Sequence, residues 1–69
     1  MNKMIEIYVN GEQQQVPTDY SVEQLQQQYA TSQQVAIALN NQVLPRRFWA
    51  QRLLMAGDQI LMFNLVAGG

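Results

Sequence analysis

The 69-residue sequence predicts an α+β fold, with one main helix packed across one face of a mixed sheet. Three observations predict it: a strand followed by a tight turn over residues 5–11, one helix signal over 21–29, and an apolar strand over 59–63. A chain this short holds one core. We therefore expect a single domain over residues 1–66 and a flexible Ala-Gly-Gly tail over 67–69.

The first two predicted strands form a hairpin. Residues 5–9 alternate between apolar side chains and Glu or Tyr, which is the period of a half-buried strand. Asn10-Gly11 follows, and both positions tolerate the positive φ of a type I′ turn. Residues 12–16 then predict the returning strand, and Pro17 ends its pairing because proline has no N–H to donate.

A short helix comes next. Ser21 and Gln24 have the spacing of a capping box, so we expect the helix to begin at Val22. Val22, Leu25 and Tyr29 lie at i, i+3 and i+7, which predicts one apolar face. The glutamines between them fall mostly off this face and are expected to be solvated.

An apolar run over residues 35–39 predicts a central strand. Asn40-Asn41 indicates a turn, extended structure resumes at 43–44, and Pro45 stops it.

The remaining signals lead to the last strand. Residues 46–50 predict a short helical turn. Gly57-Asp58 is a residue pair typical of turns, and it precedes the predicted strand at 59–63. With the helical segment as the crossover, the first and last strands are expected to lie side by side and parallel in the sheet centre. This arrangement is a β-grasp.

Alternation in the last strand predicts an exposed apolar patch. If Ile60 and Met62 point at the helix, then Leu61, Phe63 and Leu65 point away from it. Apolar side chains on an uncovered face mark partner binding. The alternative is that a loop covers them or that the alternation is disrupted.

Two features of the 44–56 connection allow two interpretations each. Trp49 with Phe48 could form a contact site, but a buried anchor for the connection is favoured. Arg46 and Arg47 could meet acidic residues of a partner or form a solvated pair.

Composition excludes several classes of function. The sequence has no Cys and no His, so thiol nucleophiles, His bases and the commonest zinc ligands are absent. Its five Asp and Glu residues are scattered, with no spacing typical of a metal site or an acid/base pair. A net charge of −1 argues against nucleic acid as a partner. No apolar run reaches the ~18 residues of a membrane helix, and no signal-peptide core is present. We therefore expect a protein that is not an enzyme, holds no metal and is cytoplasmic.

The chain ends in Val66-Ala67-Gly68-Gly69, where anchoring side chains give way to two glycines and a free carboxylate. Glycine allows the walls of a partner's channel to approach the backbone closely. Four extended residues reach about 13 Å, which is enough to enter a buried site. The alternative is that the small residues carry no function, as at many chain ends.

Several motifs together resemble the bacterial thiamine-biosynthesis sulfur carrier ThiS family over essentially the full length. Residues 40–46 read Asn-x-x-Val-Leu-Pro-Arg, and Trp49 follows. Gly-Asp-x-Ile then occupies 57–60, and Val-Ala-Gly-Gly occupies 66–69. A Gly-Gly end alone is shared with ubiquitin-like proteins and molybdopterin-synthase small subunits.

The resemblance implies a ubiquitin-like protein without catalytic groups or a bound cofactor. An E1-like adenylyltransferase (ThiF-like) that uses ATP and Mg would adenylate the Gly69 carboxylate. A sulfur donor protein would convert it to a thiocarboxylate, and a thiazole synthase (ThiG-like) would take the sulfur. The expected tail residues are Ala67 and Gly68, and the expected partner-binding residues are Leu61, Phe63, Leu65 and Val66.

Other functions stay open at this point. A carrier for molybdopterin or another sulfur-containing product has the same Gly-Gly end, although those chains tend to be longer and to carry prolines before it. A ubiquitin-like protein modifier or an interaction module is the alternative from a different class.

Overall fold

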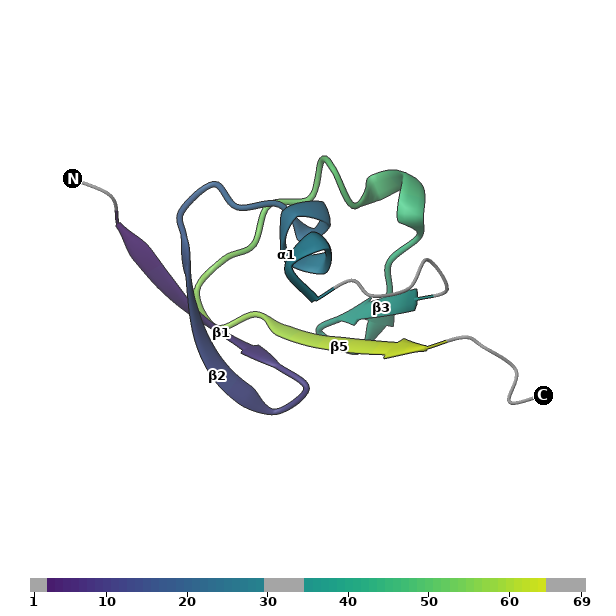
Figure 1. The fold of residues 1–69 in the computed structure, drawn as a ribbon, viewed down its shortest axis with the longest axis horizontal. Helices are drawn as coiled ribbons and strands as arrows, with labels where there is room; N and C mark the ends of the chain where they lie inside the picture. Colours follow the sequence, from purple (N-terminus) through teal and green to yellow (C-terminus); the bar gives the residue numbers. More distant parts are fainter. Residues whose placement is uncertain (1–2, 30–34, 65–69) are drawn as a thin grey trace.

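The computed structural model describes residues 3–29 and 35–64, which form a five-stranded mixed sheet with one α-helix across one face (Figure 1). The strand order is β2-β1-β5-β3-β4. The elements in chain order are β1 (Met4–Val9), β2 (Glu12–Pro17), α1 (Val22–Tyr29), β3 (Val35–Leu39), β4 (Gln42–Val43), the 3-10 helix η1 (Arg46–Phe48) and β5 (Gln59–Asn64).

The predicted hairpin is confirmed. Asn10 and Gly11 have φ values of 52° and 85°, the left-handed conformations that a type I′ turn needs. Behind this turn β1 and β2 pair antiparallel over their full lengths. Pro17 still lies opposite Met4 and is the last residue of β2, so the strand runs one residue beyond the predicted one.

The predicted β-grasp topology is also confirmed. β1 and β5 lie side by side and parallel, with Tyr8 opposite Gln59 and Val9 opposite Ile60. β5 is the central strand, and β3 pairs antiparallel with its other edge. The run at 35–39 is therefore an interior strand between β5 and β4.

Helix α1 begins with the predicted capping box. The backbone N–H of Ser21 donates to Gln24 Oε1 at 2.9 Å, and the Gln24 N–H donates to Ser21 Oγ at 3.0 Å. These bonds satisfy donors that a helix start leaves without partners. Within residues 3–29 and 35–64, no helix is long and apolar enough to cross a membrane.

The apolar face of α1 differs from the prediction at its end. Val22 and Leu25 are fully buried, but Tyr29 is 37% exposed. Tyr29 is the last residue of the helix. Gln26 is buried instead, because it lies one turn after Val22.

The core lies between α1 and the sheet and extends under the 44–56 connection. The strands lie below α1 in Figure 1. Two residues of the 44–56 connection, Trp49 and Leu54, belong to the same core. Its buried members are Ile7, Val9, Val16, Val22, Leu25, Val35, Ile37, Leu39, Trp49, Leu54 and Ile60.

Candidate functional site

The candidate site begins with β5, whose side chains alternate between core and surface as predicted. Ile60 is buried and Met62 is half-buried against the core. Leu61 and Phe63 are 50% and 44% exposed on the opposite face of the sheet. A two-residue side-chain period produces this alternation, and no described segment covers the two exposed side chains enough to bury them.

Neighbouring strands extend the apolar surface. Ala38 on β3 lies opposite Leu61 on β5 and opposite Val43 on β4, so these three side chains share one face. Ala36 lies opposite Phe63 in the same way. Alanine is too small to shield its larger neighbours, and Val43 is 69% exposed. We call the exposed Val43, Leu61 and Phe63, with the half-buried Ala36 and the buried Ala38 beside them, the outer apolar face.

Val43 was not among the residues that the sequence singled out. The available signal was that two adjacent apolar residues of an extended segment point to opposite faces, so one of Val43 and Leu44 had to face away from the core. The structure half-buries Leu44 against the core and exposes Val43. Its placement beside Leu61 nevertheless depends on two strand registers that no local pattern specifies.

A hollow of about 380 Å³ lies next to the outer apolar face, between the β1–β2 turn and the β3–β4 turn. Leu61 borders it together with residues of both turns and the start of β5. Its lining residues are Tyr8, Gly11, Asn41, Gln59, Ile60 and Leu61.

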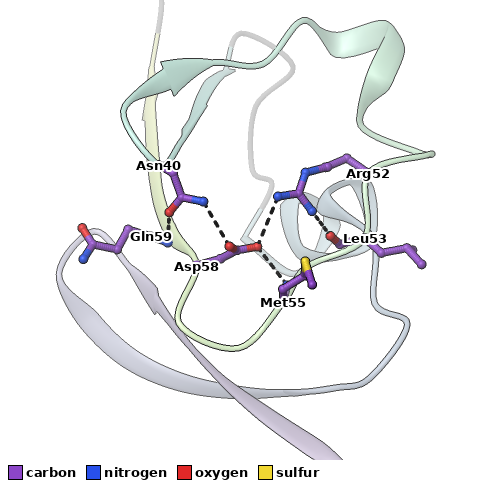
Figure 2. Close-up of polar contacts among 6 residues, drawn as sticks. All are labelled: Asn40, Arg52, Leu53, Met55, Asp58 and Gln59. Atoms are coloured by element: carbon purple, nitrogen blue, oxygen red, sulfur yellow. Dashed lines mark hydrogen bonds and ion pairs between the residues drawn. The ribbon is translucent and has the colours of Figure 1, made fainter.

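A polar network holds the beginning of β5 (Figure 2). Asp58 is buried, and its carboxylate accepts from Asn40 Nδ2 at 3.0 Å and from the Met55 N–H at 2.8 Å. Arg52 lies 3.6 Å from the same carboxylate. Asn40 also accepts from the Gln59 N–H at 2.9 Å, so three segments are joined where β5 starts.

Trp49 anchors the 44–56 connection, as the favoured interpretation predicted. It is 3% exposed, and its indole N–H donates to the Leu44 carbonyl at 2.8 Å. Phe48 is exposed, with the Arg47 guanidinium 4.8 Å from its ring centre. The Arg46 guanidinium lies 4.6 Å from the centre of the Trp49 ring, so both arginines stack on aromatic rings.

The predicted tail lies outside the described residues. Leu65, Val66, Ala67, Gly68 and Gly69 all follow the end of β5 at Asn64. Their roles, and the division between a domain at 1–66 and a tail at 67–69, stay predictions. Within the described part of the chain, no three Asp, Glu, His or Cys side chains gather as a metal site would require.

Comparison with known proteins agrees with the fold and the motifs. The model of the ThiS family matches residues 2–69. The sulfur carrier protein ThiS of Escherichia coli (strain K12) is 48% identical over 48 residues, which span 70% of this chain and 68% of that protein. A crystal structure of the thiamine biosynthesis protein (ThiS) from Geobacter metallireducens matches with a TM-score of 0.78 and 25% identity, covering 94% of this chain and 100% of that one. The chain therefore belongs to the ThiS family.

Proposed function

We propose that this protein carries sulfur for the synthesis of the thiazole of thiamine, on a thiocarboxylate at Gly69. The observation that carries the proposal is that Leu61 and Phe63 of the outer apolar face lie on β5, and that the terminal Gly-Gly begins five residues after Phe63. A partner that docks on Leu61 and Phe63 would receive the C-terminus directly from the same strand. The similarity to a sulfur carrier protein supports the same function.

The first step is adenylation of the C-terminus. An α-carboxyl group is ionised at neutral pH, so Gly69 needs no base from its own chain. One carboxylate oxygen attacks the α-phosphorus of ATP, a P–O bond forms and pyrophosphate leaves. The E1-like adenylyltransferase supplies Mg²⁺ and the positive groups that stabilise the developing phosphoryl charge.

The second step replaces oxygen by sulfur. A sulfur nucleophile from the donor protein attacks the acyl-adenylate, a C–S bond forms and AMP leaves. Where the donor is a persulfide, a thiol then cleaves the S–S bond and becomes part of a disulfide, which releases the thiocarboxylate. The thiazole synthase takes the sulfur from that group. We place these steps in the cytoplasm, where ATP is available to the adenylyltransferase.

Reconstitution tests the proposal. The purified protein is incubated with a ThiF-like adenylyltransferase, ATP, Mg²⁺ and a sulfur donor, and its intact mass is measured. We expect the intact mass of the carrier to increase as one oxygen is replaced by sulfur. The mass should return to its starting value when a ThiG-like synthase and its substrates are added. A thiocarboxylate that only a molybdopterin synthase consumes would indicate a different product. Isopeptide linkage of Gly69 to other proteins would indicate a modifier.

A further inference from the structure

Asn10 lies where β1 ends, and it remains in contact with β5. The backbone pairing of the two strands runs through Val9 opposite Ile60. The Asn10 N–H then donates to the Ile60 carbonyl at 2.8 Å. With φ of 52°, Asn10 turns the main chain away into the hairpin, and β1 stops there.

The side chain of Asn10 forms hydrogen bonds with β5 beyond the last residue pair that the two backbones form. The Met62 N–H donates to Asn10 Oδ1 at 2.9 Å, and Asn10 Nδ2 donates to the Met62 carbonyl at 3.3 Å. A carboxamide carries the same donor and acceptor as a peptide group. One side chain therefore bonds both backbone groups of a residue 52 positions away.

Met62 is the last residue of β5 for which the structure gives such contacts on the β1 side. On the other edge, β3 stays paired through Val35 opposite Asn64. Without the Asn10 side chain, β5 would be held on one edge only from Leu61 onward. A strand held on one edge has fewer contacts to fix its direction.

We propose that Asn10 is a positioning residue: by bonding the Met62 backbone it fixes the direction in which the C-terminal segment leaves the sheet toward the adenylyltransferase. The inference rests on the proposed function, because it concerns delivery of Gly69. The side chain touches neither ATP nor the reacting carboxylate in this scheme. It acts through β5.

Turn geometry alone does not account for these contacts. Asn40 has nearly the same φ, 51°, in the β3–β4 turn, and its amide also bonds β5, through the Gln59 N–H. Glycine satisfies a positive φ at either position. The two asparagines therefore form a matched pair: Asn40 holds the start of β5, and Asn10 holds it near the tail.

The experiment compares Asn10→Gly with Asn40→Gly. Adenylation kinetics are measured with the full-length carrier as the varied substrate, well below the unfolding temperature of each variant. Exchange of the Met62 amide hydrogen is followed by NMR. We expect Asn10→Gly to accelerate that exchange and to raise KM about fivefold with kcat little changed, because only a fraction of the molecules presents the tail correctly. Asn40→Gly should lower thermal stability and raise KM much less than Asn10→Gly does, because it loosens the start of β5 and not the end near the tail.

Asn10→Asp provides a graded variant. It keeps an oxygen for the Met62 N–H but places a second oxygen, in place of the donor, against the Met62 carbonyl. Its KM should fall between those of the parent and Asn10→Gly. An unchanged KM in Asn10→Gly, or an equal rise in Asn10→Gly and Asn40→Gly, would overturn the inference. Absence of adenylation in the parent chain would instead overturn the proposed function, and the inference with it.

Discussion

Asn40 and Asp58 are joined by a hydrogen bond of 3.0 Å that ties the β3–β4 turn to the start of β5. Asp58 is buried, yet each of its carboxylate oxygens has a donor. Because β5 carries the outer apolar face and leads to the C-terminus, this network sets where that strand begins. It also predicts how the chain responds to substitution.

Asp58→Asn should lower the free energy of unfolding by about 1–3 kcal/mol, measured by urea denaturation. The amide of the variant has only one oxygen, so its NH₂ group must face one of the two donors, the Met55 N–H or the Asn40 side-chain NH₂. A donor then faces a donor. Arg52→Ala is the control and should cost less than about 1 kcal/mol, because the Arg52 side chain is one-third exposed and the ion pair is long, at 3.6 Å. A larger loss of stability in Arg52→Ala would show that the ion pair with Asp58 contributes more than the hydrogen bond from the Met55 N–H.

Leu61→Glu and Phe63→Glu should leave the fold intact and weaken binding to the adenylyltransferase at least tenfold, because burying an unpaired charge costs a few kcal/mol. Titration calorimetry measures the affinity, and circular dichroism checks the fold. Gln27→Glu on the exposed side of α1 makes the same charge change and should bind normally. Unaltered affinity in both β5 variants would remove the outer apolar face from the docking surface.

Trp49→Phe should lower the free energy of unfolding by about 1–3 kcal/mol, because the Leu44 carbonyl loses its donor and the smaller ring leaves space in the core. Phe48→Leu at the exposed neighbouring position should change stability by less than about 0.5 kcal/mol. Chemical denaturation measures both. Equal losses would contradict the assignment of Trp49 as the anchor.

Deletion of Gly69 should abolish acyl-adenylate formation with little change in thermal stability. The deletion withdraws the carboxylate by about 3.3 Å, and misplacement of about 1 Å can already lower a rate ~100-fold. Gly69→Ala keeps the reach but adds a methyl group, so we expect partial impairment. Intact mass after incubation with adenylyltransferase, ATP and sulfur donor measures both variants. Sulfur gain by the deletion variant at the parent rate would refute the role of the terminus.

Local interactions made much of the fold predictable. The positive φ at Asn10-Gly11 and the capping box between Ser21 and Gln24 depend on residues at most three positions apart. The alternation that exposes Leu61 and Phe63 follows from the two-residue period of one strand. Each of these features can be derived from a short window of sequence.

Only the tertiary structure decided which distant residues share a surface or a bond. Val43 joins Leu61 because β3 lies between their strands in particular registers, and Asn10 meets Met62 because β1 lies parallel to β5. Tyr29 is 37% exposed although it occupies the i+7 position of the predicted helix face. Strand register and helix length result from packing the whole core. A local pattern therefore predicts which face a side chain occupies, whereas the partners on that face are selected by contacts far apart in sequence.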